Sequence, residues 1–465
     1  MHPNETKEGR LATDAMNEIQ ERILTSVDRH RQRILDAERY IWAHPETGFR
    51  EWNTSKYLAD VFTELGYTLI MAGNVPGFYT DIETGRPGPR VLVLCELDAL
   101  LCAEHPDAVN GAVHCCGHNA QCAGLVGVAA ALAEPGALDR FSGSIRLMAV
   151  PAEEILELGF REGLRRDGVI RYLGGKVEFM YRGYMDGVDL AFMIHAANDE
   201  THDFIARSGS NGCMLKQLAY RGKAVHASAP YDGVNALYAA TLGLQAVNSL
   251  RETFYDEDHT RVHPILTAGG GAVNAIPAYA SVESYVRGAS LDAITRVNRR
   301  VNRAFAGAAL SMGAELTITD RPGYHPLHND VNLLRLCEEC MTALVGKDRV
   351  GFDNTAWSAG CTDMGDISAV MPAIHPYACG ATGIGHGADY RIADPERACV
   401  NSAKAQLLLL DALLSNDAAE AKRIVAEATP VFPSKEAYFA AMDAITMDRD
   451  VVAYGADGTA VVRWE

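Results

Sequence analysis

The chain has 465 residues, of which 48% are hydrophobic, and a formal net charge of -18. This length exceeds one ordinary hydrophobic core and predicts two or three domains of about 100–200 residues each. The acidic balance, without a dense run of Lys and Arg, argues against a nucleic-acid partner, because phosphate binding needs clustered cations.

The first half of the chain alternates helical and strand-like segments. Apolar residues at helical spacing predict a helix from Ala15 to about Trp42 and another from Ser55 to Leu65. Three compact apolar runs predict buried strands at Val91–Cys95, Ile145–Val150 and Leu190–Ile194, with a helix at Ala120–Ala133 between the first two. Strands that alternate with helices predict an α/β domain with a parallel sheet and flanking helices.

Residues from about Ser208 to Tyr324 show a different order of predicted strands and helices. Strand-like segments at Met214–Tyr220, Ala280–Val286 and Ala314–Thr319 surround two amphipathic helices at Asn235–Thr253 and Leu291–Met312. This order predicts an α+β domain inserted into the first domain. We therefore expect a catalytic domain at 1–207 and 326–415, which ends in the helix Ala403–Leu414. The inserted domain occupies 208–325, and a C-terminal extension at 416–465, helical and then strand-like, has no assigned chemistry.

Side chains that suit a metal follow each of the three predicted strands. Asp98 follows the first strand, Glu153 and Glu154 follow the second, and His195 follows the third. In open parallel sheets, ligands bind beyond the carboxyl ends of the strands. We therefore expect these side chains to meet at one edge of the sheet.

The run HCCGHN, residues 114–119, adds a thiol and an imidazole close together. Cys116 and His118 are two residues apart, so both can project to one side of an extended or looped backbone. Asn119 is the expected N-cap of the helix that follows. A thiolate with an imidazole suits a divalent transition metal, zinc above all.

Glu153 and Glu154 are expected to point in roughly opposite directions, because successive side chains alternate at a strand end. One can then bind the metal while the other acts as general base, as amide hydrolysis by metal-activated water requires. A structural zinc site is the alternative. It would also use His114, Cys115 or Cys122 and would leave no open position for water.

Eight segments resemble the amidohydrolase branch of the M20 metallopeptidase family, in that branch's order: HPETGF, ELDAL, HCCGHN, PAEE, KAVHASAP, NAIP, TDMGDIS and GIGH. The resemblance extends from about residue 30 to 415, and the branch includes aminobenzoyl-glutamate hydrolases, auxin-conjugate hydrolases and dipeptidases. It implies an α/β catalytic domain with a mixed, mostly parallel sheet and two metal ions. It also implies that the inserted α+β domain is a lid that mediates dimerisation.

The resemblance also implies roles for individual residues. Cys116 would bridge the two metal ions, with the other ligands being His118, Glu154, His195 and His386. Glu153 would be the general base. His375, in IHPY, remains an alternative to His386, whose Gly-rich setting in GIGHGADY resembles the family's last ligand loop.

In the lid, His226 resembles a histidine that the family presents to the scissile carbonyl oxygen, often from the partner subunit, where it would stabilise the oxyanion. Asn274 and Arg287 could bind a substrate carboxylate, for which arginine suits a bidentate grip. The wider family has His-x-Asp where this chain has Glu96-Leu97-Asp98. His118 must therefore supply the imidazole, and Asp98 acts at most through a neighbouring ligand.

The residues thus predict a metal-dependent amidohydrolase, with zinc favoured over manganese and cobalt, and the resemblance implies a homodimer with two divalent ions. Its substrate would be a small N-acyl or N-aroyl amino acid, of the aminobenzoyl-glutamate kind, cleaved near a free carboxylate. The alternatives are a dipeptidase for dipeptides with a basic C-terminal residue and a non-catalytic metal-binding protein. The polar N-terminus, apolar runs of at most about 12 residues and eleven scattered cysteines predict a cytoplasmic protein without a membrane partner.

Overall fold

A computed structural model describes residues 7–464 of the chain, with side chains described from residue 18 onward. The chain forms two compact units. Unit 1 comprises Met1–Ser208, His328–Ala356 and Val370–Val431, and unit 2 comprises Gly209–Leu327, Trp357–Ala369 and Phe432–Glu465. No helix of the described residues is both long and apolar enough to cross a bilayer.

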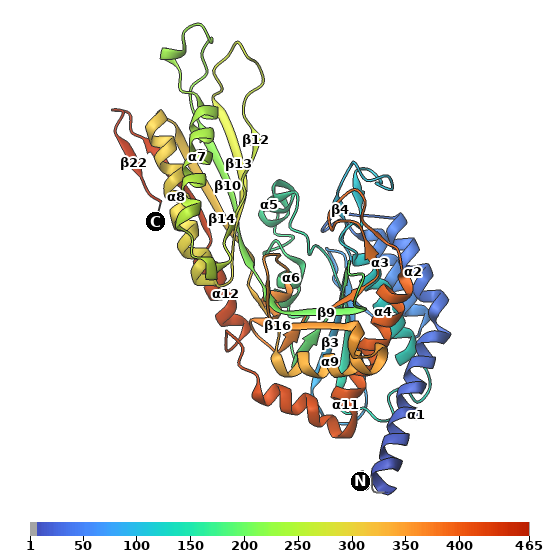
Figure 1. Cartoon of the computed structure of the whole chain (residues 1–465). Coiled ribbons are helices and arrows are strands. Elements are labelled where there is room, and N and C mark those ends of the chain that lie inside the picture. The colour runs from blue at the N-terminus through green and yellow to red at the C-terminus, as the bar shows by residue number, and fades with distance from the viewer. Residues whose placement is uncertain (1–6, 465) are drawn as a thin grey trace. The chain divides into compact units, whose positions relative to one another are not determined.

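Unit 1 is built on a six-stranded sheet with the strand order β1-β2-β6-β3-β7-β17 (Figure 1). Its strands are β1 (Ile70–Met71), β2 (Phe78–Glu83), β3 (Arg90–Glu96), β6 (Ser144–Val150), β7 (Leu190–Phe192) and β17 (Ala373–Ile374). The last four are mutually parallel, whereas β1 and β2 are antiparallel to their neighbours. The predicted strands and the predicted mixed, mostly parallel sheet are therefore confirmed.

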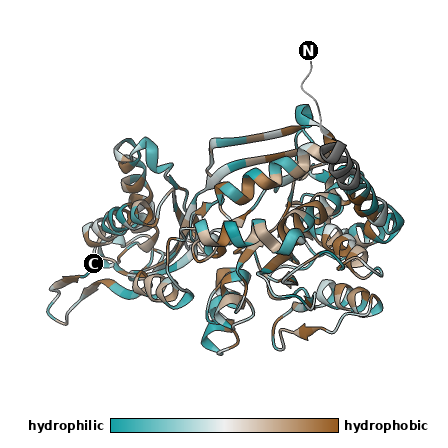
Figure 2. Ribbon diagram, turned by 90° about the horizontal axis from the view of Figure 1, so that it is seen from below, coloured by the Kyte–Doolittle hydropathy of each residue, from teal (hydrophilic) through white to brown (hydrophobic). Residues whose placement is uncertain are grey.

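Helices cover this sheet, and their bounds are α1 (Lys7–Arg29), α2 (Arg31–Ala43), α3 (Trp52–Glu64), α4 (His118–Leu132), α9 (Val331–Val345) and α11 (Asn401–Glu427). Every residue of α4 is buried. Its small residues permit close packing, since a Cβ added at Gly127 would lie 2.7 Å from both Ile34 of α2 and Ala403 of α11. Figure 2 shows hydrophilic and hydrophobic residues alternating along the outer helices, as expected for helices with one buried face.

The prediction of one helix from Ala15 to Trp42 is wrong. The chain leaves the helical conformation at His30 (φ -97°, ψ 6°), which separates α1 from α2. The His30 ring lies 3.1 Å from the Glu134 carboxylate beyond α4. A tertiary contact therefore accompanies the break. The helical spacing of apolar residues continues across His30, so the sequence does not reveal where the helix ends.

Shorter elements of unit 1 surround the ends of the parallel strands. They are β4 (Leu100–Leu101), β5 (Ala112–Val113), α5 (Leu158–Arg166), α6 (Gly175–Tyr181), β8 (His195–Ala197), β18 (Tyr377–Cys379), β19 (Ala381–Thr382) and β20 (Arg391–Ile392). Strand β18 pairs with β8 in parallel, with Tyr377 opposite His195. Strands β8 and β18 belong to a small sheet with the order β15-β9-β18-β8, in which β16 also pairs with β9. The bounds of the other three strands are β9 (Phe204–Ser210), β15 (Leu327–His328) and β16 (Val350–Ser358).

Unit 2 has a largely antiparallel sheet with the order β11-β13-β10-β14-β21-β22, and β12 also pairs with β13. The strands are β10 (Gly212–Arg221), β11 (Arg261–Val262), β12 (Ile265–Ala268), β13 (Tyr279–Gly288), β14 (Glu315–Tyr324), β21 (Met447–Tyr454) and β22 (Ala460–Val462). Helices α7 (Ala236–Leu250), α8 (Leu291–Met312), α10 (Met364–Ser368) and α12 (Lys435–Ala444) belong to the same unit. Its core includes Tyr220, Val282 and Phe305, all fully buried. The strands and helices predicted between Met214 and Thr319 are confirmed.

The end of the chain adds strands to unit 2. Strand β21 pairs antiparallel with β14, and β22 pairs with β21. Ser415–Ala418 leave the helical conformation within α11, so the helix predicted to end at Leu414 does end there and a second helical segment follows to Glu427. The segment predicted to be a C-terminal extension, 416–465, is therefore divided between a helical segment of unit 1 and helix α12 with two strands of unit 2.

Candidate metal-binding active site

A glycine turn fixes Cys116 and His118 at the start of α4. Gly117 has a left-handed φ of 90° and is the N-cap of that helix. A Cβ at this position would lie 2.4 Å from the Tyr390 hydroxyl oxygen and 2.8 Å from Ala196 Cβ, so only glycine fits. The prediction of Asn119 as the N-cap is wrong. Asn119 is inside the helix, where its amide donates to the Glu38 carboxylate at 2.9 Å.

Side chains from separate segments of unit 1 form three overlapping groups that could hold a metal ion. They are Cys116, His118 and His195; Cys116, Glu154 and His386; and Glu96, His118 and Glu153. Within each group the ligand atoms all lie within 4.8 Å of one another. Because Cys116 and His118 are each shared by two groups, the three groups form one continuous cluster.

Individual distances show how closely these segments meet. Cys116 Sγ lies 3.4 Å from His195 Nε2, and the rings of His118 and His195 are 5.5 Å apart at an angle of 87°. His386 Nε2 lies 3.3 Å from Glu154 Oε1. The His386 backbone N–H also donates to the Cys115 carbonyl oxygen at 2.8 Å, which ties the last loop to the first.

Asp98 lies behind the cluster and orients two of its members. His118 Nδ1 is 2.8 Å from the Asp98 carbonyl oxygen and 3.3 Å from its Oδ1. The other carboxylate oxygen of Asp98 accepts the Glu154 backbone N–H at 2.8 Å. With Nδ1 held in this way, the Nε2 atom of His118 is aimed into the cluster, where it is buried and lies 3.1 Å from Glu96 Oε2 without a well-aligned hydrogen bond.

The two adjacent glutamates after β6 join different groups. Ala152, immediately before them, has a positive φ of 58°, and its N–H donates to the Glu51 carboxylate at 2.7 Å. Glu153 lies with Glu96 and His118, whereas Glu154 lies with Cys116 and His386. The carboxylates therefore reach different parts of the cluster, as two different chemical roles require.

Glu96 and Lys176 form a fully buried ion pair that sequence reasoning missed. Glu96 Oε2 lies 3.1 Å from His118 Nε2 and accepts a hydrogen bond from the Gln121 amide at 2.8 Å. Burial opposes ionisation of Glu96, but the charges of Lys176 and His118 hold its pKa below the usual range. The sequence marks Glu96 only as a departure from the family pattern, and Lys176 is 80 residues away with no spacing signal.

Two of the ligand candidates, His195 and Glu154, are held in forms that can bind a cation. Burial and the nearby His118 lower the pKa of His195 to about 4, despite the opposing charge of Glu96. Burial opposes ionisation of Glu154 as well, but the hydrogen bond and charge of His386 hold its pKa below normal. At neutral pH a neutral imidazole and a carboxylate therefore face the cluster, and both are metal-binding forms.

Four other candidates stand outside the three groups. His114 and His375 are buried with no hydrogen bond at either ring nitrogen, and burial lowers the pKa of each to about 3. His375 packs against His195, with ring centres 5.4 Å apart. Cys115 belongs to a small apolar cluster, and Cys122 donates to the Glu96 carbonyl oxygen at 3.0 Å. Among the described residues, then, the set needed for a closed structural zinc site does not assemble.

The donors of the cluster fit a divalent transition ion. They comprise one thiol, three imidazoles and three carboxylates, and the buried His118 Nε2 makes no well-aligned hydrogen bond although Glu96 Oε2 lies 3.1 Å away. A buried donor set that is poorly satisfied is costly, and a bound cation would compensate for it. Soft and borderline donors of this kind suit zinc and its neighbours better than calcium or magnesium.

Unit 2 holds the three predicted lid residues but does not bring them together. His226 and Asn274 are both exposed and adjacent, because His226 bridges to Ala275 and the Ala227 N–H donates to the Asn274 carbonyl oxygen. Arg287 lies near the other end of β13, opposite Cys213, and its buried Nε makes no hydrogen bond. About eight strand residues separate the two ends, which corresponds to roughly 27 Å. The catalytic and binding roles of these residues remain predictions.

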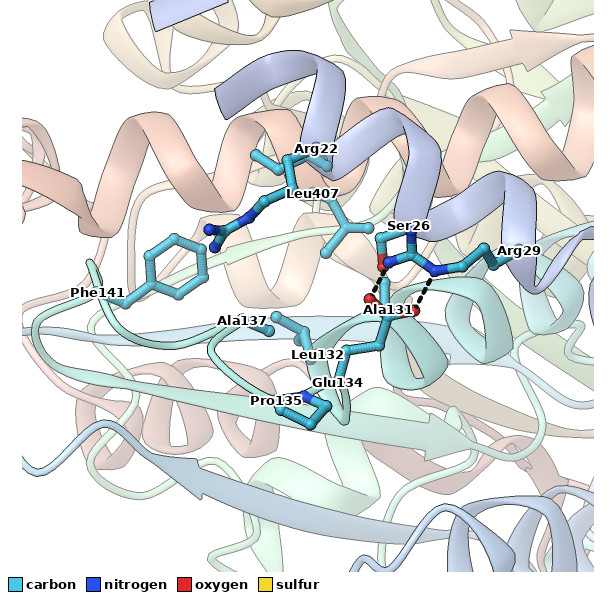
Figure 3. A pocket seen from close by; sticks show the side chains of 11 residues that line it. Arg22, Ser26, Arg29, Ala131, Leu132, Glu134, Pro135, Ala137, Phe141 and Leu407 are labelled. Carbon is cyan, nitrogen blue, oxygen red and sulfur yellow. Dashed lines mark hydrogen bonds and ion pairs between the residues drawn. The ribbon is translucent and has the colours of Figure 1, made fainter. Parts of the chain in front are cut away.

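A second feature of unit 1 is a pocket of about 200 Å³ formed by α1, α11, the end of α4 and the loop after it (Figure 3). Arg29 and Glu134 form an ion pair at its wall, and its other lining residues include Phe141 and Leu407. None of the metal-ligand candidates lines it. It is therefore separate from the cluster.

The sequence pattern of the peptidase family M20/M25/M40 matches residues 95–412. The chain belongs to this family. The matched range contains every residue of the metal-ligand cluster.

Known relatives agree with this assignment. The mouse Xaa-Arg dipeptidase is 28% identical over 373 residues, which cover 77% of this chain and 79% of the mouse protein. A p-aminobenzoyl-glutamate hydrolase chain of Escherichia coli is 29% identical over 63% of this chain and 59% of its own length. The Bacillus subtilis YXEP protein, described as a dinuclear metal binding peptidase, has the same fold. Its TM-score is 0.62 at 21% identity, with coverage of 83% of this chain and 99% of that protein.

The predicted family and enzyme class are confirmed. This M20 chain is a hydrolase that acts on amide or peptide bonds, and a small amide fits it as substrate. The ligand cluster and the family together support the binding of divalent metal ions.

Proposed function

We propose that this M20 hydrolase cleaves the amide bond of an N-acyl or N-aroyl amino acid, with Glu153 as general base. The observation that carries the proposal is the division of the adjacent glutamates: Glu154 lies with Cys116 and His386, and Glu153 lies beside His118. One carboxylate is thus available to hold a metal and the other to move a proton.

Each part of the cluster has a task in this reaction. Cys116, His118, Glu154, His195 and His386 would hold two divalent ions, which supply Lewis acidity to water and to the amide carbonyl. Glu153, a carboxylate with 6% exposure, accepts a proton from the attacking water and delivers it to the leaving nitrogen. Asp98 keeps the His118 ring in position. Glu96 would contribute negative charge next to His118 while Lys176 holds it ionised.

Several observations support two ions and support His386 over His375. Cys116 is shared by two ligand groups, as a bridging thiolate requires, and the YXEP protein with the same fold is described as dinuclear. The thiolate favours zinc, with manganese or cobalt as alternatives. His386 Nε2 lies beside Glu154, whereas His375 belongs to none of the groups.

The choice of substrate rests on the relatives. The E. coli relative acts on p-aminobenzoyl-glutamate, which favours an aroyl or acyl amino acid with a free carboxylate. The mouse Xaa-Arg dipeptidase matches a larger share of both chains, and this favours a dipeptide with a basic C-terminal residue as the second candidate. In either case Asn274 or Arg287 would bind the carboxylate.

A homodimer through unit 2 would bring the lid residues to one substrate. Asn274 precedes the start of β13, and Arg287 lies about eight strand residues, or roughly 27 Å, beyond that start, so we infer that one small substrate does not contact both in a single copy. Unit 2 also exposes apolar side chains on the edge strand β12, namely Ile265 (61% exposed) and Leu266 (40%). An exposed apolar edge strand is prone to pair with another copy. His226 of one subunit would then serve the oxyanion in its partner.

A reducing compartment suits the cysteines, since all eleven are free thiols. We therefore propose that the enzyme works in the cytoplasm.

The test is metal analysis of the purified protein together with the release of free amino acid from a panel. The panel contains p-aminobenzoyl-glutamate, N-acetyl and N-benzoyl amino acids, and dipeptides ending in Arg, Lys or Ala. We expect about two zinc-type ions per chain and turnover concentrated in the acyl or aroyl compounds. Turnover of the basic dipeptides alone would select the second candidate, and a protein with neither metal nor turnover would overturn the hydrolase proposal.

Mixed dimers test the shared site. Glu153→Gln and His226→Ala subunits, each inactive alone, should regain part of the activity when mixed, because one of the two sites then has both residues. A mixture that stays inactive while the two chains demonstrably exchange would contradict a shared site.

A further inference from the structure

Unit 2 contains a second hollow, of about 650 Å³, which the proposed hydrolysis does not use. Four arginines of α8, together with Ile445 and Trp464 from the end of the chain, line it. We call it the arginine pocket. Pockets for small organic molecules usually measure about 300–1,000 Å³, so its size suits such a ligand.

The arginines share one face of α8. Arg296, Arg299, Arg300 and Arg303 are spaced three, four and seven residues from the first, which places them side by side on a helix. Like charges at these spacings repel one another and destabilise a helix. Such a group is unexpected in a chain with a net charge of -18, unless an anion binds there.

Two of the arginines are held in place and two are free. Arg296 is ion-paired with Asp258 and with Asp292, which also lines the pocket. Arg300 donates to the Thr253 carbonyl oxygen at 3.1 Å. Arg299 and Arg303 are exposed, and neither has an acidic partner in the part of the chain that the structure describes. Positive charge is thus available on the Arg299–Arg303 side.

The last residues of the chain supply an apolar wall. Ile445 follows α12, and Trp464 follows β22 beyond the hairpin that joins β21 to β22 (Figure 1). Both are partly buried against the core of unit 2. An indole offers a broad face on which a flat ring can stack, and guanidinium groups bind phosphate or carboxylate through two parallel hydrogen bonds.

We propose that the arginine pocket binds a small organic polyanion whose adjacent anionic groups contact Arg299, Arg300 and Arg303 and whose flat ring packs on Trp464. Nucleoside polyphosphates combine these two features. The carboxylate of Asp292 repels anions at the Arg296 end, so the charged part of the ligand lies toward Arg303. The end of the chain, through Trp464, thereby forms a wall of the binding site.

Isothermal titration of the full-length protein with ATP, inorganic tripolyphosphate and adenosine tests this site. We expect ATP to bind more tightly than tripolyphosphate, and adenosine to bind weakly. Arg299→Ala/Arg303→Ala should weaken ATP binding by about tenfold or more. The control, Arg33→Ala/Arg335→Ala, removes the same charge from a half-buried and an exposed arginine of unit 1 and should leave ATP binding unchanged.

Trp464→Ala tests the ring separately, and it should weaken ATP binding while leaving tripolyphosphate binding intact. Circular dichroism verifies folding, and Arg299→Gln/Arg303→Gln replaces the alanine variant if that variant unfolds. Three results would overturn the proposal: no binding of ATP, equal losses in the pocket variant and the control, or equal affinities for ATP and tripolyphosphate that Trp464→Ala does not change.

Discussion

The ligand cluster of unit 1 and the arginine pocket of unit 2 each gather several charged or ionisable side chains, but in opposite environments. In unit 1, Glu96, His118 and Lys176 are fully buried, and each is fixed by neighbours from other segments. In unit 2, Arg299 and Arg303 come from a single helix and are exposed. Burial makes the first group intolerant of change, because an unpaired buried charge is costly. Exposure leaves the second group free to bind and release a ligand.

The largest effect is expected at Glu153. Glu153→Gln keeps the size of the side chain but cannot accept a proton, so the hydrolysis rate should fall by about 10³-fold or more. Metal content, measured by elemental analysis, should stay unchanged. Glu162→Gln, which alters a glutamate paired with Arg165 on α5, is the matched control and should retain activity. Unchanged turnover in Glu153→Gln would remove the general base from the mechanism.

A variant at Lys176 tests whether burial makes an ion pair more costly to break than an exposed one. Lys176→Met leaves Glu96 buried without its counter-ion and should lower the free energy of unfolding by about 3–4 kcal/mol in urea titrations. Lys56→Met breaks an exposed ion pair with Asp60 and should cost less than about 1 kcal/mol. The double variant Lys176→Met/Glu96→Gln should recover part of the loss. Similar losses at Lys176 and Lys56 would argue against the role of burial.

Metal removal should act on unit 1 through the cluster. A metal present at about 100 times its dissociation constant stabilises the folded state by about 2.7 kcal/mol, so chelation should lower the unfolding temperature and abolish activity. Added zinc should restore both. In Cys116→Ser the chelator should have a smaller effect on the unfolding temperature, because a ligand shared by two groups is weakened. An unfolding temperature unaffected by chelation would contradict tight binding at the cluster.

The pKa of Glu38 shows the effect of burial on a carboxyl group that has no strong ion-pair partner to offset it. Burial raises the pKa of Glu38 from 4.5 to about 7, against the opposing effects of Arg39 and the hydrogen bond from Asn119. The folded state therefore holds this proton more tightly than the unfolded state, and stability should fall as pH rises from about 4.5 to about 7. Glu38→Gln should remove about 3 kcal/mol of this decline. Parallel pH profiles of wild type and variant would show that Glu38 does not titrate in this range.

The motifs of the sequence located most of the cluster, because its ligands follow apolar strands or precede a buried helix. Cys116, His118, Glu154 and His195 were predicted in this way, and the structure brings their ligand atoms within reach of one another. Glu96 and Lys176 could not be paired from the sequence, since 80 residues separate them. The break at His30 and the N-cap at Gly117 were also missed, because a tertiary contact accompanies one and the close approach of Tyr390 and Ala196 fixes the other.

By itself, the sequence determined the family, the α/β fold with its mixed sheet, and the residue types that meet a metal. Periodicity and short motifs are local properties that are readable along the chain. Only the tertiary structure decided that the two adjacent glutamates join different ligand groups, that the last strands complete the sheet of unit 2, and that Trp464 faces the arginines of α8. These outcomes depend on which distant segments pack together. Burial and sheet pairing select the partners, and neither partner's own sequence identifies the other.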